Sequence, residues 1–255
     1  ERNSYEQLVL NNNNKYLKQN SVRRALYYAI DRENLRRTLL KDEGEVVNTA
    51  YPPSYGPRLK NEDINMYEYD SNRASQILTG ELKWDYYNNC MYDKGEQVKF
   101  ELLYTQNDEI ARLCPPIIQE NLKKVGIEII TMKVNMTEMI DRLRKGDYDM
   151  ALVTSDSIVD PDLRNSFHSS SIKDGTNYTG YKSNKLDKLI EDGEKCTDAN
   201  KRMEIYAEAA KILNNDIPII FLFKRADKRI LSSNISNVMY NPFTDFYKVN
   251  EWIIE

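Results

Sequence analysis

The sequence is poor in the residues on which most metalloproteins and many enzymes depend. Its 255 residues include one histidine, His168, and three cysteines, Cys90, Cys114 and Cys196. A single histidine removes most metal-ligand sets and general-base arrangements, and three scattered cysteines are too few for a disulfide scaffold or a zinc cluster. We therefore expect no metal site and no cofactor.

Long hydrophobic runs and an excess of charge of one sign are also missing. The mean hydropathy is −0.70, and no run of 18 apolar residues occurs, which excludes a transmembrane helix. The 40 acidic and 36 basic residues nearly cancel, whereas a nucleic-acid-binding protein would show a basic face. We expect no nucleic-acid partner. The start at Glu1, without a methionine or a signal peptide, is typical of a processed product or an expressed fragment.

Alternating strand and helix patterns dominate the middle of the chain. Apolar spacing predicts strands over 98–104, 127–134 and 148–154, with helices over 117–125 and 137–145 between them. Such alternation favours parallel strands joined by right-handed crossovers, and so an α/β fold with a mixed, largely parallel sheet flanked by helices. No linker rich in glycine, serine or proline divides the chain, so we expect one compact lobe.

Capping residues and prolines set the expected helix boundaries. Asn20 or Ser21, Asp31 and Asp70 are expected to cap three early helices. We place Pro115 and Pro116 before the middle helix or in its first turn, because an interior proline removes a hydrogen bond. Further segments follow the same patterns: helices over 186–194 and 200–213, and strands over 5–10 and 217–223.

Candidate chemistry is sparse. No G-x-S-x-G nucleophile elbow, phosphate loop or dinucleotide fingerprint occurs. His168 precedes three serines, so a hydrolase that uses His168 stays open as an alternative. Asp160-Pro161-Asp162 is an acidic loop just past a predicted strand, where open α/β sheets bind ligands. Tyr181 lies in a polar segment that could form the wall of a ligand cleft.

The order of several short segments resembles one known family. Val22-Arg23-Arg24-Ala25-Leu26 followed by Ala29-Ile30-Asp31-Arg32 is similar to that family's V-R-x-A-L…A-I-D-R stretch. Further similar segments follow in family order: Tyr69-Asp70, Ile118-Gln119 with Gly126-Ile127, Asp147-Tyr148-Asp149, Asp160-Pro161-Asp162, Asn177, Gly180-Tyr181, Asn184, Leu186-Asp187, Asp198, Arg202, Tyr206, Asp216 and Pro218. The chain resembles the extracytoplasmic solute-binding proteins of peptide and nickel ABC importers, over the C-terminal half of such a protein.

The resemblance implies one lobe of a two-lobed periplasmic-binding-protein fold, which binds a peptide or other small solute when the two lobes close. Its implied partners are the missing N-terminal lobe and a membrane permease. It implies a hinge-proximal strand and turn at 1–20, the ligand-binding lobe at 21–227, and C-terminal strands returning toward the hinge at 228–255. The parent protein would be extracytoplasmic and anchored as a lipoprotein, the fragment itself soluble, and its role binding rather than catalysis.

We expect the ligand site at the end of the strand that precedes the acidic loop. The predicted ligand-binding residues are Val153, Thr154, Ser155, Asp156, Asp160, Asn177 and Tyr181. Peptide-binding members of the family often carry a tryptophan and an amine-binding aspartate there, but the matching positions hold Thr154 and Ser157, with Asp156 one residue away. A nickel- or haem-binding member of the family, and a protein-interaction module without a small ligand, stay open as alternatives.

Overall fold

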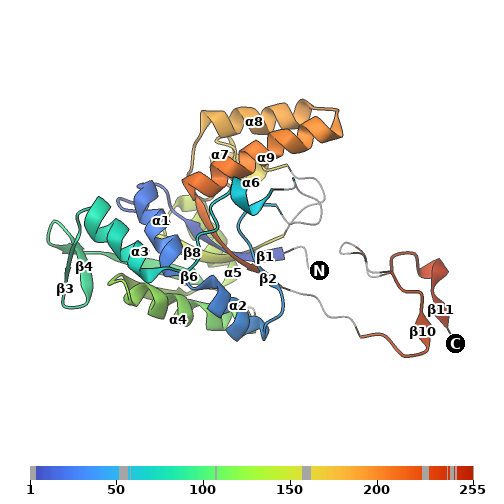
Figure 1. Ribbon diagram of the computed structural model, residues 1–255, viewed down its shortest axis with the longest axis horizontal. Coiled ribbons are helices and arrows are strands. Elements are labelled where there is room, and N and C mark those ends of the chain that lie inside the picture. The colour runs from blue at the N-terminus through green and yellow to red at the C-terminus, as the bar shows by residue number, and fades with distance from the viewer. Residues whose placement is uncertain are drawn as a thin grey trace.

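A six-stranded mixed sheet forms the centre of the computed structural model (Figure 1), which describes residues 4–51, 57, 59–106, 108–156, 162–225, 230–239, 241, 244 and 246–254. The strand order is β2 (Glu45–Val46), β9 (Ile219–Lys224), β1 (Ser4–Leu10), β8 (Met150–Asp156), β6 (Lys99–Tyr104) and β7 (Glu128–Lys133). β6 is parallel to β7 and β8, whereas β1 is antiparallel to β8 and β9, and β2 to β9. β6, β7, β8 and β9 therefore share one direction, which confirms the predicted mixed, largely parallel sheet.

Helices cover both faces of this sheet (Figure 1). Four of them pack with Leu8 of β1 in one core cluster: α1 (Asn20–Ala29), α2 (Arg32–Leu40), α3 (Ser71–Gln76) and α4 (Glu109–Lys123). Four others pack with Val9 in a second cluster: α5 (Met136–Lys145), α6 (Arg164–Phe167), α8 (Asn184–Lys195) and α9 (Ala199–Asp216). Neighbouring residues of a strand point to opposite faces, so the two clusters are the two sides of one sheet. The short α7 (Ser171–Asp174) follows α6.

Two of the predicted helix caps are confirmed, and one is wrong. Asp31 accepts a hydrogen bond from the backbone N–H of Asn34 at 2.9 Å, and Asp70 caps α3 in the same way. Neither Asn20 nor Ser21 caps α1, because both are already helical and the residue before them, Gln19, makes no side-chain cap.

The predicted start of the middle helix is also wrong. α4 begins at Glu109, and the carboxylate of Asp108 accepts a hydrogen bond from Ala111 N at 2.8 Å. Pro115 and Pro116 therefore lie inside the helix, although an interior proline costs about 3 kcal/mol. An acidic N-cap stabilises this first turn, and the buried Pro115 packs with the apolar side of the helix toward the sheet.

Two arginines of the segment 22–32 stabilise the fold. Arg23 is buried and donates to the backbone oxygens of Leu17 at 2.6 Å and Ile217 at 2.9 Å. Arg32 is buried beside the ring of Tyr27 and donates to backbone oxygens that include Met66 O at 2.6 Å. Both side chains donate hydrogen bonds to backbone carbonyl oxygens that would otherwise be buried without a donor.

Smaller elements lie at the periphery. A three-stranded sheet that the sequence did not reveal consists of β3 (Asp85–Tyr87), β4 (Cys90–Asp93) and β5 (Glu96–Gln97). Asn88 and Asn89 both have positive φ between its first two strands, as in a tight hairpin turn. The single-turn elements are η1 (Asn61–Asp63), the π-helix η2 (Ile77–Glu81) and η3 (Val249–Glu251).

The C-terminal strands form a sheet of their own. β10 (Ile235–Ser236) pairs with β11 (Ile253–Ile254), to one side of the main sheet and its helices (Figure 1). The sequence Asn241-Pro242-Phe243 is typical of a turn, but it lies partly outside the described residues, since Pro242 and Phe243 are not among them. The division of the chain at residues 20 and 227 stays a prediction.

Candidate functional site

The end of β8 has one open edge. On one side β8 pairs with β1 along its whole length, through to Ser4 opposite Asp156. On the other side β6 pairs with β8 only at Met150 and Ala151, because β6 ends at Tyr104 and the chain turns toward α4. Within the described ranges, β8 therefore has no strand partner on that side from Leu152 onward.

The side chains at this end of β8 alternate between the two faces. Val153 and Ser155 line a cavity on the α6 side of the sheet. Thr154 also contributes to the cavity, but its hydroxyl donates to the carboxylate of Glu6 at 3.0 and 3.2 Å. Three of the predicted ligand residues thus meet at one place. The side chain of Asp156 lies outside the described residues, as do Ser157 and Asp160.

The cavity beside β8 has a volume of about 220 Å³ and a neutral lining. We call it the Gln7 cavity; its described lining residues are Tyr5, Gln7, Val9, Val153, Thr154, Ser155, Ser166, Phe167, Thr176, Tyr178, Thr179 and Ile219. Gln7 is only 7% exposed, and its Oε1 has no hydrogen-bond partner. A buried polar atom without a partner in a cavity wall points to a ligand, because such an atom is costly to leave unpaired.

An ionic cluster joins three chain segments on the opposite face of the sheet. Arg225, directly after β9, lies 2.6 Å from the Glu6 carboxylate and 2.6 Å from that of Asp108 at the start of α4. Burial raises the pKa of Glu6, and the nearby Arg225 guanidinium opposes this rise. Partial burial also acts to raise the pKa of Asp108, but hydrogen bonds from Arg225 and Ala111 N outweigh it and lower that pKa. The cluster fixes β1, β9 and α4 to one another at the end of β8.

Asn177 and Tyr181 hold a loop rather than line the Gln7 cavity. The Asn177 amide donates to the backbone oxygens of His168 at 3.2 Å and Tyr181 at 3.1 Å, and accepts from the Thr179 hydroxyl at 2.7 Å. The Tyr181 hydroxyl donates to the carboxylate of Asp216. The loop that they fix brings Tyr178 and Thr179 into the cavity wall.

Sequence reasoning missed Gln7 and Glu6, although a signal was present. All seven residues of β1 are buried, and the adjacent polar residues Glu6 and Gln7 lie in the middle of this strand. Polar side chains in a fully buried strand need partners on both faces, here Arg225 and Thr154 for Glu6 and the cavity for Gln7.

Comparison with known proteins identifies the family. Residues 1–178 match the family model described as "Bacterial extracellular solute-binding proteins, family 5 Middle". The chain belongs to this family. It is 30% identical over 253 residues to the oligopeptide-binding protein AppA of Bacillus subtilis, covering 98% of this chain and 46% of AppA. It is 26% identical to the probable D,D-dipeptide-binding periplasmic protein DdpA of Escherichia coli, covering 93% of this chain and 44% of DdpA.

Solved structures of other proteins show the same fold. AppA of Bacillus subtilis in complex with a nonapeptide superimposes with a TM-score of 0.85 at 28% identity, covering 100% of this chain and 51% of that one. NikZ of Campylobacter jejuni in complex with Ni(L-His) has a TM-score of 0.82 at 21% identity, covering 99% and 52%. The chain therefore spans about half the length of these proteins. The family comprises solute-binding proteins, not enzymes.

The remaining sequence candidates have structural partners in this family 5 lobe. Asp149 accepts from Glu101 N at 2.8 Å and Asn14 Nδ2 at 2.7 Å, and Asp162 accepts from Arg164 N at 2.8 Å. Across the described ranges, no group of three histidine, cysteine, aspartate or glutamate side chains is placed to hold a metal ion, and no helix is both long and apolar enough to cross a membrane.

His168 lies in a local turn. Its Nδ1 accepts the backbone N–H of Ser170 at 3.1 Å and lies 2.7 Å from the Ser170 hydroxyl, and its Nε2 is 3.5 Å from Glu191. His168 is only 7% exposed, and it is not among the residues that line the described cavities. A nucleophilic serine needs room for a substrate beside its base, and the described cavities leave none at this turn.

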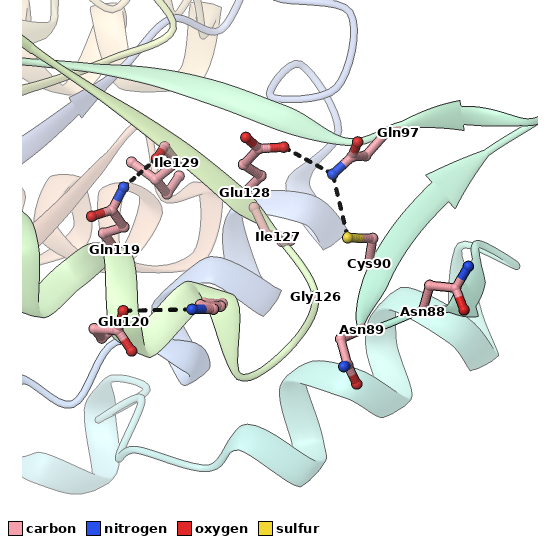
Figure 2. A pocket seen from close by; sticks show the side chains of 11 residues that line it. Asn88, Asn89, Cys90, Gln97, Gln119, Glu120, Gly126, Ile127, Glu128 and Ile129 are labelled. Carbon is pink, nitrogen blue, oxygen red and sulfur yellow. Dashed lines mark hydrogen bonds and ion pairs between the residues drawn. The ribbon is translucent and has the colours of Figure 1, made fainter.

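A larger hollow of about 480 Å³ lies elsewhere, between β4, α4 and β7 (Figure 2). Figure 2 shows that Gln97, Gln119 and Glu120 are already paired with other residues of its lining. Gln97 donates to Glu128 at 2.8 Å and to Cys90 Sγ at 3.3 Å, and Gln119 donates to Ile129 O at 2.6 Å. The smaller Gln7 cavity is the stronger ligand candidate, because it contains a buried acceptor without a donor and adjoins the open edge of β8.

Proposed function

We propose that this chain is one lobe of the substrate-binding component of an ABC importer, and that it takes a peptide as an added strand. The observation that carries the proposal is the open edge of β8 beyond Ala151. An extended peptide can pair its backbone with such an edge, which gives affinity independent of sequence, while alternate side chains enter pockets. AppA and DdpA, which are named as peptide-binding proteins, support the peptide as the ligand class.

The site residues divide into two roles in this proposal. Within residues 153–155, the backbone groups that point to the open edge pair with the peptide while the alternate ones pair with β1, and Val153 and Ser155 also line the Gln7 cavity. Asp156 is the last residue of β8 and Asp160 comes four positions later in the sequence; we propose that one of these carboxylates pairs with the peptide's amino group. Asn177 and Tyr181 act on the ligand only through the loop that they hold.

Closure of a second lobe over β8 completes the proposed site. Family relatives are about twice as long as this chain, so the other half of the cleft would come from the rest of the parent protein. The C-terminal segment exposes apolar side chains, with Ile254 of β11 74% exposed and Phe246, in a turn before it, 69% exposed. We propose that these side chains pack against that other lobe. Ligand that bridges two lobes shifts an open–closed equilibrium toward the closed state.

The cellular setting follows from the same proposal. The parent protein would work outside the cytoplasm, anchored as a lipoprotein, and deliver its ligand to a membrane permease. It would bind without turnover, so a peptide incubated with it should be recovered intact. The single lobe should bind peptides weakly or not at all, because half of the contact surface is absent.

Backbone methylation of the ligand tests strand addition without disturbing the protein. The two-lobed parent protein is titrated calorimetrically with tetra- and pentapeptides in which each backbone N–H is replaced in turn by N–CH₃. Pairing along one edge of β8 uses every second ligand residue, so methylation should weaken binding at alternate positions, by about tenfold or more each. Equal effects at all positions, or none at any, would contradict strand addition, and failure of every peptide to bind would contradict the peptide ligand itself.

A further inference from the structure

Gln7 places an unpaired acceptor in the wall of the ligand cavity. Its Oε1 is buried and has no hydrogen-bond partner. The residues opposite it on the neighbouring strands are Val153 and Phe221, whose side chains carry no polar atom. The register with β9 shifts between Glu6 and Gln7, an irregularity that re-aims side chains and is frequent beside functional sites. A ligand group that enters here therefore gains most if it carries a donor.

The walls of the cavity select against charge and in favour of a ring. Tyr5 and Phe167 are buried aromatic walls, and Val9 and Ile219 add aliphatic surface. No charged side chain is among the described lining residues, so a lysine, arginine, aspartate or glutamate side chain would be buried without a counter-charge. A cavity of about 150 Å³ suffices to bind benzene, and the 220 Å³ here has room for a ring with one polar atom attached.

The position of the cavity also requires a long side chain. The open edge is one edge of β8, and β1, which carries Gln7, pairs with the opposite edge of β8. A strand added at that edge is therefore about two strand spacings, roughly 10 Å, from the axis of β1. The hydroxyls of serine and threonine are too close to their own backbone to cover this distance, whereas a phenol places its hydroxyl at the far end of a rigid ring.

We propose that the Gln7 cavity is a specificity pocket for a tyrosine side chain of the bound peptide, whose hydroxyl donates to Gln7 Oε1. This inference rests on the proposed peptide-binding function and adds the side chain that the site prefers. A phenylalanine fits the same walls but leaves the Gln7 oxygen buried without a donor, and a site built around such a hydrogen bond discriminates against the analogue that lacks it.

A matched set of peptides and variants tests the pocket in the two-lobed parent protein. Alanine-based pentapeptides carry tyrosine, phenylalanine, tryptophan or lysine at each position in turn, and affinities are measured by calorimetry. The variants are Gln7→Leu, Gln7→Asn and, as a matched control, Gln76→Leu, which removes an exposed glutamine of α3. Thermal unfolding of each variant verifies folding, and the tyrosine–phenylalanine comparison in the unaltered protein needs no variant.

The expected result is that at one position tyrosine binds about tenfold or more tighter than phenylalanine, and lysine binds weakest. Gln7→Leu should abolish the difference between tyrosine and phenylalanine, and Gln76→Leu should preserve it. If peptides bind but tyrosine and phenylalanine are equal at every position, if tryptophan is preferred over tyrosine, or if the difference survives Gln7→Leu, the specificity pocket is refuted while peptide binding stands. If no peptide binds, the proposed function and this inference both fail.

Discussion

Gly193 of α8 offers a prediction in which two physical effects of known size oppose each other. A Cβ added at this position would lie 2.4 Å from Cε1 and 2.7 Å from Cζ of Tyr206 on α9. Unstrained carbon atoms are separated by about 3.5–4.0 Å, so Gly193→Ala requires a movement of more than about 1 Å. Tyr206 is fully buried and its ring is rigid, so the movement must come from the helices themselves.

The relative sizes of two effects decide whether Gly193→Ala raises or lowers the free energy of unfolding. Replacing a helical glycine with alanine stabilises a helix by about 1 kcal/mol, whereas forcing an extra carbon into a packed interior costs about 1–3 kcal/mol, occasionally more. With an overlap this severe, we expect Gly193→Ala to lower the free energy of unfolding by about 1–2 kcal/mol. For a chain of this length that corresponds to a melting temperature about 2–8 °C lower.

Gly80 is the matched control, because it is exposed and an added Cβ would meet nothing within 4 Å. Urea unfolding of the 255-residue chain, followed by circular dichroism, should show Gly80→Ala equal to or up to about 1 kcal/mol more stable than the unaltered chain. If Gly193→Ala is as stable as the unaltered chain, the close packing of α8 on α9 described above is refuted.

Three further predictions concern buried polar groups. Arg32→Lys should lower the free energy of unfolding by about 2–4 kcal/mol, because one ammonium cannot reproduce the guanidinium fork, whose Nη1 donates to Val47 O and whose Nη2 donates to Met66 O and Tyr67 O. The exposed Arg37→Lys should change the free energy of unfolding by less than about 0.5 kcal/mol. Burial raises the pKa of Cys114, so mass spectrometry after brief alkylation of the native chain should find this thiol unmodified while the two half-buried cysteines react; equal labelling would contradict its burial. Burial also raises the pKa of the Glu6 carboxyl from its ordinary value of 4.5, so the folded chain binds the carboxyl proton more tightly than the unfolded chain does. The folded state therefore loses stability as the pH rises above about 4.5 and Glu6 ionises. Glu6→Gln has no such proton, so its stability relative to the unaltered chain should rise with pH in urea titrations, and a pH-independent difference would contradict this.

Local patterns made much of the fold predictable. The alternation between residues 98 and 154 gave β6, β7, β8 and the helices between them, because apolar periodicity is a property of neighbouring residues. The two prolines predict too late a start for α4, because the helix begins at the acidic cap of Asp108 and continues through them. The peripheral hairpin was missed because its short strands have no apolar period, although the Asn88–Asn89 pair is a typical turn.

The candidate site was predictable only where its residues share one strand. Val153 and Ser155 meet at the cavity because alternate residues of β8 face the same side. Gln7 joins them through strand pairing across more than 140 positions of sequence, which no local pattern reports. Asn177 follows the end of β8 by about 20 positions in the sequence, but its side-chain amide donates to the backbone oxygens of His168 and Tyr181 in its own loop.

Amide hydrogen exchange of the two-lobed parent protein, with and without a saturating peptide, tests strand addition at β8 most directly. We predict that exchange slows at least tenfold within Leu152–Asp156 on binding, while the outer edge of β7, with its exposed Ile130 and Met132, keeps its rate. Unchanged exchange in Leu152–Asp156 together with new protection along β7 would contradict the assignment of β8 as the ligand-pairing strand.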